Sequence, residues 1–152
     1  MVLGIGNTLL TDEGAGIHAL HGLPESLAER EGVRLVDGGT LSFTLVSEIE
    51  GAAHLLVLDA ARLDAEAGTV RVYEDDDMDR FLSSGRCASV HEVSLLDLLG
   101  IAALTGHAPA RRALVGVEPG STDWGDAPTP PVAAAIQHMG EQAAAVVERW
   151  RS

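Results

Sequence analysis

Glu13, Asp59 and His91 are the three side chains whose types and positions could together bind a divalent cation. Each stands where a strand is expected to end or a helix to begin, so one edge of a sheet could bring them together. Two carboxylates and one neutral imidazole suit divalent nickel or zinc. Three protein ligands leave room for a fourth from a substrate, which suits a transient site better than a structural metal.

Glu13 follows a glycine turn, at the predicted start of a helix that begins near Asp12. This region superficially resembles a dinucleotide-binding loop, but the G-x-G-x-x-G pattern that starts at Gly4 has Leu9 in place of its last glycine. Two carboxylates at the helix start would also repel a pyrophosphate. The helix dipole favours an ionised Glu13, which could then meet a cation. The alternative is that Asp12 or Thr11 caps the helix and Glu13 only decorates its first turn.

Asp59 directly follows the apolar run from 55 to 58, and His91 lies within Ser89-Val90-His91-Glu92. The spacing of Ser89 and Glu92 is that of a capping box, which would place His91 in the first turn of a helix. The helix dipole there disfavours imidazolium, so His91 should be neutral and able to bind a metal. Taken singly, Asp59 could be a turn residue and His91 a surface or core histidine.

Five short apolar runs predict five strands. They are Met1–Ile5, Val33–Val36, His54–Leu58, Thr69–Tyr73 and Ala113–Val117. Helical spacing joins Leu41, Leu45 and Ile49, then Leu96, Leu99 and Ala103, and finally Val132, Ile136, Met139, Ala143, Val146 and Trp150. The acidic run from 74 to 79 is better explained as a solvated helix start than as a metal-binding loop.

Alternation of strands and helices predicts a single α/β domain over residues 1–152. We expect a five-stranded, mostly parallel, twisted sheet with helices on both faces. The link between the third and fourth strands is short and contains Gly68, so the fourth strand is expected to be antiparallel and at an edge.

The composition narrows the classes of partner. A net charge of −13 argues against nucleic acid or a membrane surface as a partner. The chain contains no Lys, which removes lysine-based catalysis, and it has a single cysteine, Cys87. A signal peptide and a membrane-spanning run are both missing from the sequence pattern. We therefore expect a cytoplasmic protein, and a monomer.

The motifs resemble those of the hydrogenase maturation endopeptidases over nearly the whole chain. Gly4-Ile5-Gly6-Asn7 with Leu10-Thr11-Asp12-Glu13 is similar to the first family motif, and Asp37-Gly38-Gly39-Thr40 to the loop after the second strand. Asp59 before alanine and His91 in Ser-x-His-Glu resemble two further metal contacts. Val115-Gly116-Val117-Glu118-Pro119 resembles the last strand and its loop. The first strand is shorter than is usual in this family, so the true start could lie upstream.

The resemblance implies an endopeptidase that removes a C-terminal extension from the large subunit of a nickel–iron hydrogenase after nickel insertion. Nickel would arrive with the substrate and would be contacted by Glu13, Asp59 and His91. Asp37, also a candidate catalytic residue, would position the scissile peptide or a water molecule. Such enzymes are often classed as aspartic-type, although the sequence does not show the paired D-T-G loops of pepsin-like enzymes.

Our mechanistic hypothesis is that nickel polarises the scissile carbonyl or lowers the pKa of a bound water. Two other functions remain open on the sequence. One is a peptidase of broader specificity with its own zinc at the same residues, and the other is a non-enzymatic, nickel-sensing maturation chaperone.

Overall fold

The computed structural model describes residues 1–86 and 94–152, and its centre is a five-stranded sheet in the order β2-β1-β3-β5-β4. The strands are β1 (Val2–Gly4), β2 (Leu35–Asp37), β3 (His54–Ala60), β4 (Val70–Glu74) and β5 (Arg111–Val117). All five predicted strands are confirmed, with boundaries that differ by a few residues.

Four of the strands are parallel, and the fourth strand in the chain is the exception. β1 pairs in parallel with β2 and β3, and β3 pairs in parallel with β5. Within the described part of the chain β4 pairs with β5 alone and runs antiparallel to it, so it forms one edge of the sheet. The predicted antiparallel edge strand is therefore confirmed, and the four parallel strands end at one common edge, called here the carboxyl edge.

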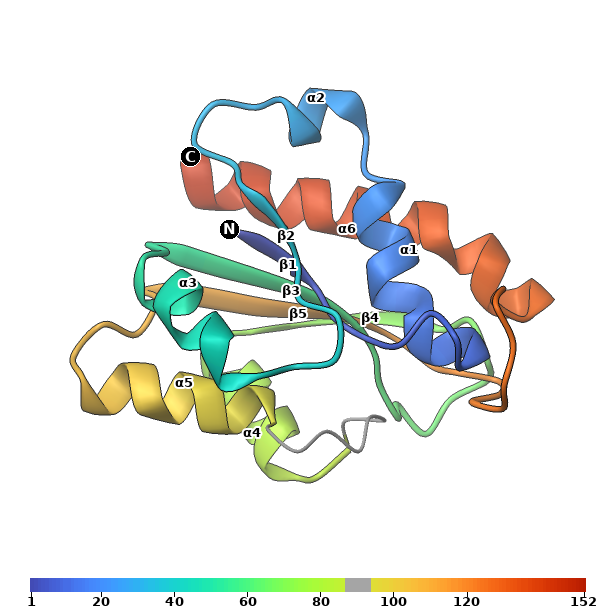
Figure 1. Ribbon diagram of the computed structural model, residues 1–152. Helices are drawn as coiled ribbons and strands as arrows, with labels where there is room; N and C mark the ends of the chain where they lie inside the picture. The colour runs from blue at the N-terminus through green and yellow to red at the C-terminus, as the bar shows by residue number, and fades with distance from the viewer. Residues whose placement is uncertain (87–93) are drawn as a thin grey trace.

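Helices cover both faces of this sheet (Figure 1). One face carries α1 (Ala15–His21), α2 (Glu25–Ala28) and α6 (Pro130–Arg151), and the other carries α3 (Val46–Glu50), α4 (Asp75–Ser83) and α5 (Leu95–Leu104). Two 3-10 turns, η1 (Thr11–Gly14) and η2 (Phe43–Leu45), precede α1 and α3. None of the described helices is long and apolar enough to cross a membrane.

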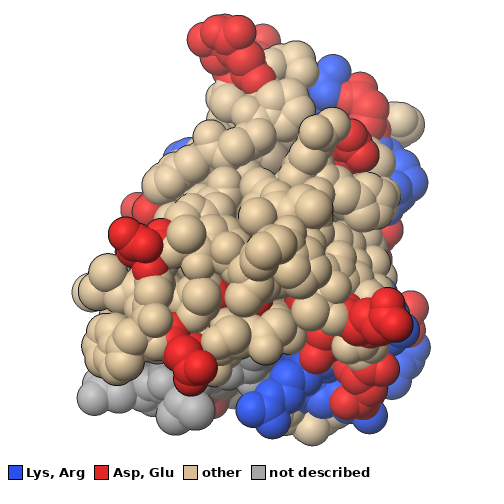
Figure 2. All heavy atoms as spheres, turned by 90° about the vertical axis from the view of Figure 1, so that its right-hand side faces the viewer, with Lys and Arg blue, Asp and Glu red and all other residues tan. Residues whose placement is uncertain are grey.

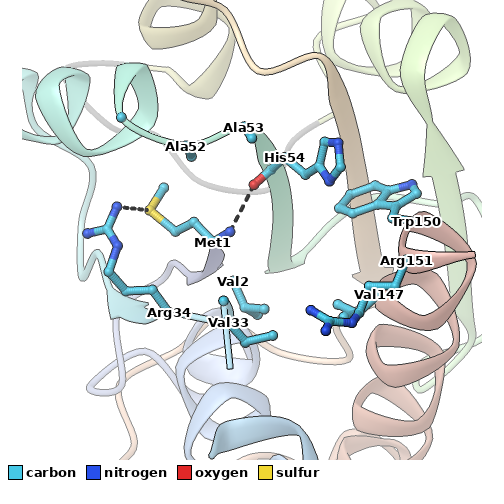
Figure 3. A pocket seen from close by; sticks show the side chains of 12 residues that line it. Met1, Val2, Val33, Arg34, Ala52, Ala53, His54, Val147, Trp150 and Arg151 are labelled. Carbon is cyan, nitrogen blue, oxygen red and sulfur yellow. Dashed lines mark hydrogen bonds between the residues drawn. The ribbon is translucent and has the colours of Figure 1, made fainter. Parts of the chain in front are cut away.

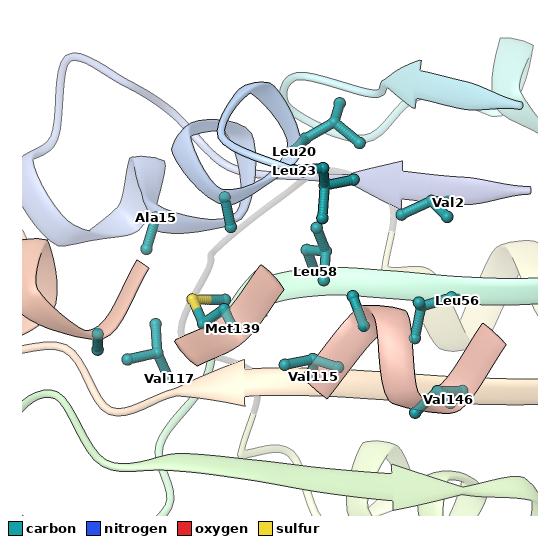
Figure 4. Close-up of a cluster of buried hydrophobic side chains, with 14 of the residues drawn as sticks. Val2, Ala15, Leu20, Leu23, Leu56, Leu58, Val115, Val117, Met139 and Val146 are labelled. Carbon is teal, nitrogen blue, oxygen red and sulfur yellow. The ribbon is translucent and has the colours of Figure 1, made fainter. Parts of the chain in front are cut away.

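Alternate residues of the central strand β3 belong to two separate hydrophobic clusters, one on each face of the sheet. Leu56, Leu58 and Ala60 pack with α1 and α6, in the cluster that Figure 4 shows around Met139. Leu55 and Val57 pack on the opposite side with α3, α4 and α5. The period of two expected of a strand thus buries β3 on both faces.

The start of α1 lies very close to the sheet. A Cβ at Gly16 would collide with the carbonyl oxygens of Leu58 and Ile5. Only glycine lets α1 approach the ends of β1 and β3 so closely.

The buried stripe predicted for α5 was correct at Leu99 and wrong by one residue at Leu96 and Ala103. The buried residues of α5 are Leu95, Leu98, Leu99 and Ala102, whereas Leu96 and Ala103 are exposed. A uniformly apolar helix gives a weak periodic signal, which explains the error. Ser94 and Asp97 form the capping box of this helix, and the box predicted at Ser89 and Glu92 lies outside the described residues.

The acidic run is the start of a helix, as expected. Glu74 precedes α4, and the following aspartates occupy its first turn. Asp79 accepts hydrogen bonds from Arg112 of β5, and these bonds lower the pKa of its carboxyl group. The run therefore attaches α4 to the sheet.

Candidate functional site

The carboxyl edge brings two of the predicted ligands together. Glu13 lies in η1, the turn that follows β1, and Asp59 is the penultimate residue of β3. Both side chains are withdrawn from solvent, since Glu13 is 8% exposed and Asp59 2% exposed. Unpaired carboxylates are rarely buried to this degree in a protein without a functional reason.

Asp59 is the most perturbed acid among the described residues. Burial raises the pKa of its carboxyl group well above the ordinary value, although a hydrogen bond from the Ala60 N–H opposes this effect. The charge of Glu13 raises the pKa further, so the two carboxyl groups influence each other. Oδ1 of Asp59 has no hydrogen-bond partner within residues 1–86 and 94–152. A buried, unpartnered carboxylate oxygen beside a second carboxylate is suited to a divalent cation.

Gly6 determines how closely η1, which carries Glu13, lies against the end of β1. Its φ of 139° is in the region that favours glycine, and a Cβ at this position would collide with the Glu13 carbonyl. The Gly6 N–H donates to the Gly39 carbonyl at 2.9 Å, which ties this turn to the loop after β2. The glycine turn noted in the sequence thus positions η1 and its Glu13, and it does not form a phosphate-binding loop.

Asp12 has a structural function that the sequence did not reveal. Its fully buried carboxylate accepts hydrogen bonds from the N–H groups of Gly120, Ser121 and Thr129, and from the Thr129 hydroxyl. Burial raises the pKa of Asp12, but these hydrogen bonds outweigh that effect and hold the pKa below its ordinary value. Asp12 therefore joins η1 to the loop that leads into α6, over a sequence separation that no local motif shows.

Asp37 lies at the same edge but not beside Asp59. Gly4 pairs with both Asp37 and Leu58, so Asp37 is level with Leu58 and about 10 Å away across two strand spacings. The side chain of Asp37 shares the α1 face with Leu58, and Oδ2 lies 3.5 Å from Nε2 of His21. Asp59 is one residue further along and points to the opposite face.

His91 falls outside the described residues, and its predicted place in the site stays a prediction. Arg86, just before residues 87–93, has a carbonyl that accepts a 2.9 Å hydrogen bond from the Arg62 N–H. Arg62 lies three residues beyond Asp59 in the chain. Among the described residues there is no group of three histidine, cysteine or acidic side chains that could hold a metal.

Comparison with known proteins identifies the family. A family model described as hydrogenase maturation protease matches residues 17–146. The chain is also 32% identical over 148 residues to the hydrogenase 2 maturation protease of Escherichia coli, and covers 89% of it. The chain belongs to the hydrogenase maturation protease family.

Other members of this family agree in sequence and in fold. The hydrogenase expression/formation protein HupD of Rhizobium leguminosarum is 35% identical over 151 residues, and the chain spans 74% of its length. For HupM of Azotobacter chroococcum the identity is 39% and the chain spans 66% of that protein. The solved structure of the maturating endopeptidase HybD from E. coli matches with a TM-score of 0.85 at 31% identity, covering 97% of this chain and 91% of that one. The family is one of peptidases, and the mixed sheet with helices on both faces is its fold.

The carboxyl edge of this maturation protease chain has a largely uncharged centre (Figure 2). Charged side chains surround that centre, with acidic and basic groups gathered at its margins. A protein partner that reaches the edge therefore meets mainly uncharged surface before it meets the buried acids.

A well-defined cavity lies at the other end of the sheet. Its volume is about 210 Å³, and Met1, Arg34, His54 and Trp150 are among the residues that line it (Figure 3). The strands begin here, so the cavity is separated from Glu13 and Asp59 by the length of the sheet. It has no part in the site at the carboxyl edge.

Proposed function

We propose that the chain is an endopeptidase that removes the C-terminal extension from the large subunit of a nickel–iron hydrogenase once nickel has been inserted. Family membership supports the reaction class. The observation that carries the site is the unpartnered, buried carboxylate of Asp59 beside Glu13 at the carboxyl edge.

In this proposal the nickel ion belongs to the substrate and is bound only while the precursor is docked. Glu13 and Asp59 contribute oxygen ligands, and the cation replaces the proton that burial favours on Asp59. His91 is the third protein ligand. It is five residues beyond Arg86 in the sequence, and the Arg86 carbonyl accepts a hydrogen bond from the Arg62 N–H, three residues after Asp59.

Two contributions to peptide hydrolysis follow from this arrangement. Nickel bound to the precursor polarises the scissile carbonyl or lowers the pKa of a bound water, which then attacks the carbonyl carbon. The exclusion of solvent around Asp59 strengthens these electrostatic interactions. A precursor without nickel supplies no cation and is not cut, which makes cleavage conditional on nickel insertion.

We assign Asp37 to the substrate peptide rather than to nickel. Its carboxylate lies at the carboxyl edge, on the opposite face of the sheet from Asp59, and is half-exposed. At this distance from Asp59, its proposed role is to orient the substrate tail, or a water molecule bound to it, along the carboxyl edge. We further propose that the reaction takes place in the cytoplasm and that a monomer performs it.

Intact mass of a candidate large-subunit precursor tests the proposed reaction. Exposure to the chain should remove a short C-terminal peptide from nickel-loaded precursor and leave nickel-free precursor unchanged. Glu13→Gln and Asp59→Asn should fold but lose this activity. Stable binding of nickel-loaded precursor without loss of mass would indicate a chaperone instead. Chelator-resistant, stoichiometric zinc in the purified chain, with cleavage of nickel-free precursor, would indicate a zinc peptidase.

A further inference from the structure

Two large apolar side chains are exposed on neighbouring loops next to the candidate site. Leu9 is 57% exposed and Trp124 is 82% exposed. Leu9 precedes η1 by two residues, and Trp124 lies in the loop between β5 and α6. A tryptophan that is left in water on a loop forgoes a large gain from burial, so its position suggests a partner.

The backbone joins these two loops to each other. The Gly125 N–H donates to the Leu9 carbonyl at 2.9 Å, and the Thr11 N–H donates to the Gly125 carbonyl at 3.0 Å. Leu10 and Gly125 form a parallel bridge, and the Thr11 hydroxyl donates to the Asp123 carbonyl. The backbone that carries Leu9 is therefore hydrogen-bonded to the backbone that carries Trp124.

The buried carboxylate of Asp12 anchors the same two loops from below. It accepts hydrogen bonds from the N–H groups of Gly120 and Ser121. The Asp12 N–H in turn donates to the Ser121 carbonyl at 3.1 Å. Since Glu13 is the next residue, one anchor fixes both the candidate ligand and the exposed pair. A surface ordered before binding loses less conformational entropy when a partner docks.

The chemistry of this surface points to an apolar protein contact. Residues 7–11 carry no charge, and Asp123 is the single charged residue of 121–125. The two loops therefore present two exposed apolar side chains with one charged residue among their neighbours. Glu13 lies at the carboxyl edge, four residues beyond Leu9 in the chain. Tryptophan is also the side chain most enriched at the energetic centres of protein interfaces.

We infer that Leu9 and Trp124 form a docking surface for an apolar patch on the folded large-subunit precursor, beside its C-terminal extension. The inference rests on the proposed function and adds residues that select the substrate protein without taking part in the chemistry. Docking on this pair would bring the tail and its metal to the buried acids.

Tryptophan fluorescence tests the contact directly. The chain has two tryptophans, and Trp150 lies at the far end of the sheet. In a Trp150→Phe background, with a nickel-loaded precursor whose tryptophans are replaced by phenylalanine, docking should shift the emission of Trp124 to shorter wavelength. Unchanged emission at saturating precursor would overturn the inference. A shift that follows the concentration of the chain alone would also overturn it, because a second copy would then cover the surface.

Steady-state cleavage kinetics provide the second test. Trp124→Ala and Leu9→Ala should each raise KM for the nickel-loaded precursor about tenfold, with kcat within about twofold of the parent. Leu104→Ala is the matched control, because Leu104 is 90% exposed on α5 and should leave both constants unchanged. Unaltered KM in both loop variants would contradict the docking surface. Absence of cleavage by the parent chain would instead contradict the proposed function, while the fluorescence result would still report on docking.

Discussion

At the scale of single residues, the proposed cation site depends on the buried carboxyl group of Asp59. Its carboxyl group is almost fully buried, one oxygen is unpartnered among the described residues, and the charge of Glu13 further raises its pKa. Burial favours the protonated form of such an acid, whereas a neighbouring cation would favour the ionised form. The strand end predicted the position of Asp59 from the sequence, but its burial depends on helices that are distant in the chain.

Replacing Asp59 by asparagine should change how stability depends on pH. The folded chain holds the Asp59 proton to a higher pH than the unfolded chain does, so the native state binds more protons between the two pKa values. Stability of the parent therefore falls as pH rises from about 4 toward the raised pKa, by up to about 1.4 kcal/mol per pH unit. Asparagine cannot ionise, so the unfolding free energy of Asp59→Asn should rise relative to that of the parent over this pH range.

Urea denaturation of both proteins from pH 4.5 to 7.5, in the presence of chelator, measures this difference. A difference in unfolding free energy that stays constant over the range would show that Asp59 titrates normally.

At the scale of elements, glycine and a buried carboxylate set the geometry of the carboxyl edge. Gly16 lets α1 approach the ends of β1 and β3, and Asp12 joins η1 to the loop before α6. The sequence pattern was sufficient to predict the strands and the long helix α6, because their apolar periodicity is strong. It was insufficient for the Asp12 contacts, since the partners Gly120 and Thr129 are more than 100 residues away.

Gly16→Ala and Gly100→Ala should have opposite effects on stability. A Cβ at Gly16 would meet backbone oxygens of the sheet, so α1 must move away, and we expect a loss of about 2–3 kcal/mol. A Cβ at Gly100 would meet no described atom within 4 Å, so alanine should stabilise α5 by about 0.5–1 kcal/mol. Chemical denaturation of the two variants gives both values. Equal effects would contradict the close approach at Gly16.

Removal of the Asp12 carboxylate should loosen the loop before α6. Asp12→Ala leaves three partly buried N–H groups without their acceptor, and we expect a loss of about 3–5 kcal/mol. Thr129→Val removes only one hydroxyl contact and should cost about 1 kcal/mol. Hydrogen exchange should locate the change at Gly120 and Ser121. Unaltered exchange at these amides in Asp12→Ala would show that the carboxylate does not hold the loop.

At the scale of the whole molecule, one sheet serves two hydrophobic clusters. β3 contributes to both of them, so neither cluster can be lost without exposing the strands that the other requires. This arrangement supports the prediction of a single domain. That prediction followed from length and from the alternation of strands and helices, while the assignment of each helix to a face required the structure.

Core truncations on the two faces should therefore affect one common transition. Leu98→Ala on α5 and Met139→Ala on α6 each remove a fully buried side chain, and each should cost about 2–5 kcal/mol. Circular dichroism and intrinsic fluorescence should report a single unfolding step for both variants. Two separated steps in either variant would show that the faces unfold independently.

Because β4 is antiparallel to the other strands, the chain that follows it returns to the carboxyl edge once more. β4 runs from that edge to the amino end of the sheet, where Asp75 accepts a hydrogen bond from Arg111, and α4 then leads back to the contact between Arg62 and Arg86. Reversing one edge strand therefore brings Arg86 beside the chain that follows β3, while the four parallel strands keep their register.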